Sequence, residues 1–430
     1  MKFTILFVLL IPLFLTAQPR ILSQRDQATV MDELLDDRLK NLLPVLMRRE
    51  GIDMWVLISR ENNEDPVLKT MLPGTWLAAR RTTMLLIFDG GVGKETEYLA
   101  VARYDVGKVF KKSWNPEAQP DQWVQLGKLI EERNPKKIGI NKAPYYGHAD
   151  GLTANDYDKL IAVLPKSLGP NVTSAEKLAV AWLETRTEKE MTIYPQVCRI
   201  AHEIIAEGFS DRVIQPGVTT TDDVVWWYRE RIKELKLDTW FHPSVSIQRA
   251  GNSDSNVIIP GDLLHVDFGI TYLRLNTDTQ QHAYVLKAGE RQAPEYLINV
   301  FNRGNRLQDI LTGNFKAGKT GNQILADTRK QAIAEGITPS IYTHPLGYHG
   351  HGSGTTIGMW DMQQGVPFSG DYAMHLNTAY SIELYAESDV NEWGKKIRIQ
   401  LEEDGYFDAT GFRYIDGRQT EIILIPKPQR

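Results

Sequence analysis

The feature that most constrains this chain is a pair of aspartates in two neighbouring strand-like segments. Residues 264–269 alternate between apolar and polar positions, which predicts a strand with Asp267 on the face opposite its apolar residues. Asp278 has the same parity in a second run, 275–286, and the residues between the runs are enough for a hairpin. Two carboxylates held close together raise one pKa unless a cation lies between them, and a metal ion is the common cation. The alternative is an exposed sheet face on which both aspartates are solvated.

Composition places the chain among globular proteins of two or three domains. It has 430 residues, of which 42% are hydrophobic, and a net charge of -5. No block of lysine and arginine is present to neutralise phosphates, so we expect no nucleic-acid partner. Cys198 is the single cysteine, which excludes an intramolecular disulfide, and its apolar neighbours predict a buried thiol.

Residues 1–17 have the outline of a secretory signal peptide. Lys2 precedes an apolar run over 3–15, and the small residue Ala17 stands where cleavage would fall. The run is too short to span a bilayer comfortably. We therefore expect an exported protein, periplasmic or secreted, and the alternative is an N-terminal membrane anchor that stays attached.

The rest of the chain divides into two parts of different character. Strand-like and helical segments alternate over 26–165, which predicts an α/β unit that opens with a helix over 31–49. We expect a linker over 166–184, because 165–170 is rich in residues that break regular structure, although 175–183 has helical spacing. Residues 185–426 are predicted to be α+β, with helices over 188–209, 221–235, 294–312 and 321–335 and strands from Val245 onward.

Three further segments place polar side chains in strand-like or glycine-rich sequence. Glycines flank His351 and leave little side-chain bulk around its ring, and His344 and His349 precede it within eight residues. Glu383 and Glu402 each lie in an alternating, strand-like run. Either glutamate alone is explained by a solvated strand face, so the case rests on the whole set.

That set is Asp267, Asp278, His351, Glu383 and Glu402, which offers four carboxylates and one imidazole. This is too much negative charge for one divalent ion and suits two ions about 3.5 to 4 Å apart, bridged by carboxylates and a water. The donors are rich in oxygen and include no thiolate. Manganese, iron, cobalt or catalytic zinc therefore fit better than structural zinc.

In these motifs the chain resembles the M24, or pita-bread, metallopeptidases, a family that includes methionine aminopeptidase, Xaa-Pro aminopeptidase and prolidase. The resembling segments follow the family's order, with aspartate strands at 266–269 and 277–279, a histidine loop at 350–354 and glutamate strands at 381–383 and 401–404. The resemblance implies a creatinase-like N-terminal domain over 26–165 and a pita-bread catalytic domain over 185–426.

The resemblance also implies an activity. It points to a metal-dependent hydrolase that cuts the peptide bond next to proline at the N-terminus of a short peptide. Glu383 would serve as general base and metal ligand, and a metal-bridging hydroxide would attack the carbonyl. His344 or His349 is the candidate for a histidine that the family often has just before its ligand loop, and we take His344 as the catalytic residue. The family commonly dimerises through its N-terminal domain, so a homodimer is a further expectation.

The chain departs from the family pattern near the site. Family peptidases have histidines that bind substrate and steady the tetrahedral intermediate, but 252–257 and 358–361 contain none. Gln281 replaces an arginine that commonly follows the second aspartate, and Gln400 replaces another that stands two before the last glutamate. Two alternatives therefore stay open. One is hydrolysis of another small amide or C–N bond, and the other is a relative that binds metal or ligand without turnover.

Overall fold

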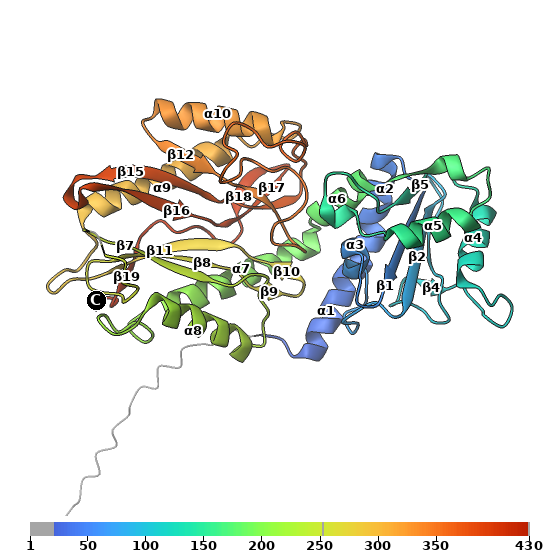
Figure 1. Cartoon of the computed structure of the whole chain (residues 1–430), viewed down its shortest axis with the longest axis horizontal. Coiled ribbons are helices and arrows are strands. Elements are labelled where there is room, and N and C mark those ends of the chain that lie inside the picture. Colours follow the sequence, from blue (N-terminus) through green and yellow to red (C-terminus); the bar gives the residue numbers. More distant parts are fainter. Residues whose placement is uncertain (1–20, 252, 429–430) are drawn as a thin grey trace, which may run out of the picture.

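The protein consists of two domains that lie side by side (Figure 1). A computed structural model describes residues 21–251 and 253–428. The predicted signal peptide, 1–17, lies outside the described residues and stays a prediction. None of the described helices is both long and apolar enough to cross a membrane.

The N-terminal domain is built on a six-stranded mixed sheet in the order β4-β3-β2-β1-β5-β6. Its strands are β1 (Met54–Arg60), β2 (Thr82–Asp89), β3 (Thr96–Ala100), β4 (Lys111–Lys112), β5 (Ile138–Ile140) and β6 (Val172–Ser174). Its helices are α1 (Gln24–Asp37), α2 (Leu43–Glu50), α3 (Pro66–Thr70), α4 (Gln122–Arg133), α5 (Ala154–Val163) and α6 (Glu176–Glu184). Alternate side chains of β1 enter two apolar clusters, one on each face of the sheet, as an α/β unit requires.

The helix expected over 31–49 is a longer helical run with an irregular centre. A π-helical turn, Arg38–Leu42, joins α1 to α2, and Gly51 ends the run with a φ of 66°. That left-handed conformation suits glycine, which has no Cβ to clash.

Much of the segment expected to be a linker is part of the N-terminal domain. β6 extends the sheet by pairing in parallel with β5. α6 is buried against the sheet, and the indole of Trp182 donates a hydrogen bond of 2.8 Å to the hydroxyl of Thr70. The proline and glycine residues at 165–170 mark only the turn before β6. Local composition misplaced the linker because the pairing of an edge strand depends on residues far away in sequence.

The second domain places its strands between two pairs of helices (Figure 1). The helices α7 (Glu188–Gly208) and α8 (Thr221–Glu234) cover one side, and α9 (Glu295–Gly313) and α10 (Gly321–Ala334) cover the other. Two apolar cores result, one under each pair of helices. The predicted combination of an α/β and an α+β domain is confirmed.

Three sheets and a short hairpin make up the strands of this domain. The first sheet has the order β19-β11-β8-β7, the second β12-β15-β16 and the third β13-β14-β17-β18. Their bounds are β7 (Ser244–Gln248), β8 (Leu263–Phe268), β11 (Thr279–Val285), β12 (Thr338–Ile341), β13 (His344–Leu346), β14 (Thr378–Ser381), β15 (Leu384–Val390), β16 (Lys395–Leu401), β17 (Asp404–Asp408), β18 (Gly411–Tyr414) and β19 (Ile423–Ile425). The hairpin pairs β9 (Thr271–Tyr272) with β10 (Leu275–Asn276).

Candidate metal centre and adjoining pocket

The two aspartates are brought together, as the sequence predicted, by an antiparallel pair of strands. β8 pairs with β11 so that Asp267 lies opposite Gln280. Leu264, Val266 and Phe268 of β8 enter the core beneath α7 and α8, which leaves Asp267 on the other face. Asp278 directly precedes β11, and its backbone N–H donates to Asp404 Oδ1 at 3.1 Å. The pairing of β8 with β11 therefore brings both carboxylates to the same side of the sheet.

The two glutamates lie where the chain passes from one sheet to another. Glu383 stands between β14 and β15, and Glu402 between β16 and β17, whereas the sequence had suggested that strands run through both. Glu402 still pairs locally with Gln280 through backbone hydrogen bonds of 2.9 and 3.2 Å. These junctions bring the carboxylates of Glu383 and Glu402 close to those of Asp267 and Asp278.

The histidine segment supplies two imidazoles to the same place. His344 is buried on β13, and its Nε2 lies 3.7 Å from Asp278 Oδ2. Its Nδ1 lies 3.0 Å from the carbonyl of Pro345. Because a carbonyl only accepts, Nδ1 carries the hydrogen and Nε2 keeps a free lone pair. His351 follows in the loop, with its ring centroid 4.9 Å from that of His344.

Glycine is required in this loop because other backbone and side-chain groups approach it closely. A Cβ on Gly350 would lie 2.2 Å from the indole of Trp240, and one on Gly352 would lie 2.5 Å from the carbonyl oxygen of Pro345. Trp240 also packs on the ring of His351, with centroids 5.0 Å apart. The glycines thus allow the loop to pack tightly around His351.

Six side chains form one continuous cluster of possible metal donors. Their ligand atoms fall into three overlapping groups, each within 4.8 Å, namely Asp278 with His344 and His351, His344 with Glu383 and Glu402, and Asp267 with Asp278 and Glu402. All five residues proposed from sequence as metal ligands are therefore brought together. His344, proposed from sequence only as a catalytic residue, is a sixth donor.

The cluster fits bound divalent cations. Asp267 Oδ1 and His344 Nε2 are buried and have no hydrogen-bond partner among the described residues. Buried polar atoms normally have partners, and an unpaired carboxylate oxygen and imidazole nitrogen are both metal donors. Four carboxylates with two imidazoles also match the oxygen-rich chemistry of manganese, iron, cobalt or catalytic zinc.

Burial and mutual repulsion raise the pKa of every carboxylate in the cluster. Burial raises the pKa of Asp267 to about 7, and burial together with the charge of Asp267 raises the pKa of Glu383 to about 8. Burial, followed by the charges of neighbouring carboxylates, raises the pKa of Asp278 and Glu402 well above the usual range. A bound cation would offset both effects, because it favours the ionised carboxylates.

Gln280 holds two of the carboxylates and was not singled out in the sequence. Its side-chain amide donates to Glu402 Oε2 at 2.7 Å and to Glu383 Oε1 at 3.1 Å. Its carbonyl oxygen lies 2.8 Å from His265 Nε2, so the orientation of the amide is itself fixed. The other oxygen of Glu402 accepts a short hydrogen bond from Ser381. The register that sets Gln280 opposite Asp267 was the signal that could have identified it.

A second layer of polar groups lies behind the donors. Cys198 is buried, as predicted, with its Sγ 3.2 Å from Asp404 Oδ2, and burial raises the pKa of its thiol well above the usual range. The thiol is therefore protonated and serves to hold Asp404. A separate pair lies nearby, with His202 Nε2 2.7 Å from Glu403 Oε2. Burial lowers the pKa of His202, but the charge and hydrogen bond of Glu403 outweigh burial, and the pKa rises to about 9.

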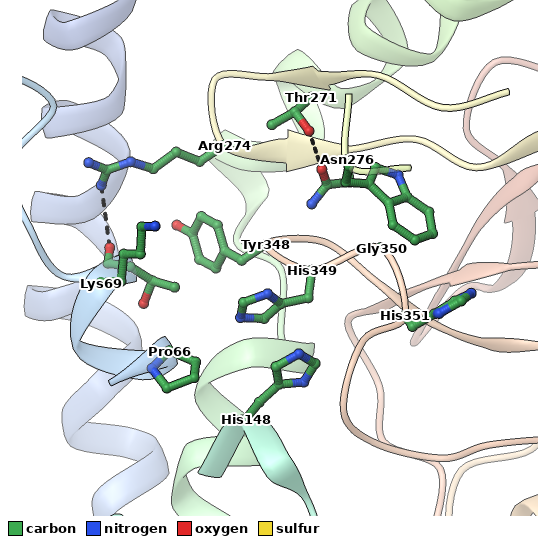
Figure 2. Close-up of a pocket in the computed structure, with 12 residues that line it drawn as sticks. Pro66, Lys69, His148, Thr271, Arg274, Asn276, Tyr348, His349, Gly350 and His351 are labelled. Atoms are coloured by element: carbon green, nitrogen blue, oxygen red, sulfur yellow. Dashed lines mark hydrogen bonds between the residues drawn. The ribbon is translucent and has the colours of Figure 1, made fainter. Parts of the chain in front are cut away.

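A pocket of about 540 Å³ adjoins the cluster where the two domains meet. It is lined by Pro66, Lys69, Thr70, His148, Trp240, Thr271, Arg274, Asn276, Tyr348, His349, Gly350 and His351. Figure 2 shows His351 at one end, while Lys69 and Arg274 lie together at the other. A pocket of this volume is in the range that holds small ligands.

Besides His351, two more imidazoles line the pocket in a chain that lacks the expected accessory histidines. His148 of the N-terminal domain stacks on His349 of the second domain, with centroids 4.0 Å apart. His148 Nδ1 also lies 2.9 Å from the hydroxyl of Ser353. Trp360, in the segment where the family has a histidine, is 74% exposed. His148 was missed because the contact crosses domains and has no signature in local sequence.

Comparisons with known proteins agree with this architecture. Residues 193–406 match metallopeptidase family M24. The chain is similar in structure to the X-Pro aminopeptidase of Thermotoga maritima MSB8, with a TM-score of 0.63 and 16% identity over 88% of this chain and 99% of that one. It is also similar to the Xaa-Pro dipeptidase of Bacillus anthracis, with a TM-score of 0.57 and 16% identity over 94% of this chain and 100% of that one.

The N-terminal domain of FACT complex subunit SPT16 from Eremothecium gossypii is similar too, with a TM-score of 0.57 and 13% identity over 91% of this chain and 99% of that one. No curated protein sequence matches the chain significantly. The structural likenesses confirm the predicted fold, an N-terminal α/β domain before a pita-bread domain. Because a named peptidase and a named complex subunit share it, the fold alone does not fix the activity.

Proposed function

Since residues 193–406 belong to metallopeptidase family M24 and the protein is thus a metal-dependent peptidase, we propose that it uses two divalent ions to remove the N-terminal residue that precedes proline in short peptides. The observation that carries this proposal is the cluster of six donors opening on a pocket at His351. The named peptidases with the same two-domain build support the choice of substrate.

The donors of the ions would be Asp267, Asp278, His351, Glu383 and Glu402, with His344 as an additional nitrogen. Bound divalent ions would lower the pKa of water and polarise a peptide carbonyl.

The chain's own residues would then move protons and orient the reacting groups. Glu383 accepts from Gln280 at Oε1, and no described residue donates a hydrogen bond to its Oε2. That oxygen is free to take a proton from water and to pass it to the leaving amine. Gln280 keeps Glu383 and Glu402 in place, and the pocket beyond His351 would hold the departing part of the peptide.

The test is an assay of alanyl-proline and longer Xaa-Pro peptides with the protein loaded with manganese, cobalt, iron or zinc. We expect release of the N-terminal residue that depends on the metal and is abolished by a chelator. If a protein shown by metal analysis to carry divalent ions cleaves none of these peptides, the proposed specificity is wrong.

A second candidate is hydrolysis of another small amide or C–N bond, favoured by the exposed Trp360 where a histidine was expected. A panel of other small amides, assayed in parallel with the peptides, separates the two.

A further inference from the structure

The interdomain pocket is positively charged at one end. Lys69, at the end of α3, and Arg274, in the turn between β9 and β10, both line it, and none of its described lining residues is acidic. The carboxylate of Asp278 has a possible ligand atom within 4.8 Å of one on His351, which stands at the other end of the pocket in Figure 2. Charge is therefore separated along the site.

Arg274 is held in place by backbone carbonyls. Its guanidinium donates to the carbonyl of Leu72 at 2.7 Å and to that of Pro73 at 3.1 Å. Arg274 and Leu273 both have a positive φ, 65° and 54°, a conformation that is strained for residues other than glycine. The strained turn thus fixes this cation at the domain interface. Because carbonyls are neutral, they leave its positive charge in the pocket.

Lys69 is exposed, and its ammonium has no hydrogen bond or ion pair with any described residue. It lines the same end of the pocket as Arg274 (Figure 2). An ammonium that faces a pocket without a counter-ion is available to a negative group on a ligand.

The cationic end of the pocket suits a short peptide with a free C-terminus. It lies on the departing side of the scissile bond, where it attracts a carboxylate. We propose that Lys69 binds the C-terminal carboxylate of a di- or tripeptide and thereby selects short substrates with a free C-terminus. This inference rests on the proposed peptidase function.

The first experiment compares alanyl-proline with its C-terminal amide, alanyl-prolinamide, as substrates of the metal-loaded protein. A hydrogen bond to a charged group is worth about 1.5 to 3 kcal/mol, or roughly tenfold or more in affinity. We expect the acid to be preferred by about that factor, mainly through KM. Lys69→Met should lose the preference and Lys69→Arg should retain most of it. Lys166→Met is the matched control, because Lys166 is exposed and does not line the pocket.

Equal rates for the acid and the amide in the wild type would overturn the inference and leave the peptidase proposal intact. A preference that survives in Lys69→Met would also overturn it. Thermal unfolding of each variant confirms that it is folded.

A second measurement does not depend on turnover. Calorimetric titration with proline and with prolinamide should show tighter binding of proline to the wild type and equal binding of both to Lys69→Met. If neither peptide is cleaved, the proposed function fails, and this titration still decides whether Lys69 binds a carboxylate. Equal binding of proline and prolinamide to the wild type would then contradict the inference.

Discussion

The metal-ligand cluster and the interdomain pocket meet at His351 but differ in charge and in origin. The cluster comes from one domain. Its carboxylates lie on or beside the paired strands β8 and β11 and at two sheet junctions, and its histidines lie on β13 and in the loop after it. The pocket takes its walls from both domains, and its charged lining residues are cationic. Backbone pairing fixes the first region, whereas domain packing fixes the second. One site thus combines a donor cluster that strand pairing determines with a pocket that depends on a few long-range contacts.

Removal of a carboxylate from the cluster should have the largest effect. Asp278 belongs to two of the three donor groups, so Asp278→Ala should abolish the binding of at least one ion and the metal-dependent activity. The loss should exceed the roughly 10–100-fold effect of removing an outer-shell partner. Metal analysis and titration calorimetry check this. Asp389→Ala, an exposed change on β15, is the control. Ion binding that survives unchanged in Asp278→Ala would show that the cluster is not the metal centre.

The two regions also predict different results for two histidines close in sequence. His344→Ala should weaken metal binding, since its unpartnered Nε2 faces Asp278. His349→Ala should leave metal binding unchanged and raise KM, because His349 lines the pocket and stacks on His148. Metal titration and steady-state kinetics of both variants provide the measurement. The division between the regions is wrong if the two variants lose metal affinity equally.

Loss of the Gln280 amide should have an intermediate effect. Gln280→Leu leaves Glu383 and Glu402 without their shared donor, so metal affinity should fall roughly 10–100-fold. Gln281→Leu is the matched control, because its amide donates to Glu403, which is not a proposed ligand. Competition with a metal indicator dye can measure both. Equal losses in the two variants would indicate general damage to β11 instead.

A buried carboxylate outside the cluster separates the effect of burial from that of repulsion. Burial is the main cause that raises the pKa of Glu184 from 4.5 to about 8, while the Tyr372 hydroxyl donates to one of its oxygens at 3.1 Å. Between these two pH values the native protein holds a proton that the unfolded chain releases. Wild-type stability therefore falls as pH rises through this window, by up to about 1.4 kcal/mol per pH unit.

Glutamine cannot lose this proton, so the stability of Glu184→Gln relative to wild type should increase from pH 5 to pH 8 and then level off. Urea unfolding at a series of pH values measures it. A difference that does not change with pH would mean that Glu184 is not protonated in the native protein.

Much of the cluster could be predicted because its signals are local. Alternation around Asp267 indicated a strand, glycines around His351 indicated a tightly packed loop, and the order of the motifs indicated the family. Gln280 and the role of His344 as a donor were missed. Each depends on which residues become neighbours across strands, and no single segment of sequence records that.

The linker and the pocket show the other limit of sequence analysis. The Pro- and Gly-rich segment 165–170 suggested a boundary, but β6 and α6, which follow it, complete the N-terminal domain. Lys69 and His148 have ordinary sequence surroundings and gain significance only where the domains meet.

The two domain classes and the five metal-donor candidates follow from the sequence, since hydrophobic periodicity and residue chemistry are properties of short segments. The convergence of six donors, the hold of Gln280 on two of them and the cationic pocket beside them emerge only when the chain is folded. These features join residues that lie far apart in sequence. Carboxylates from four segments repel one another and meet only because strand pairing and two apolar cores hold them together.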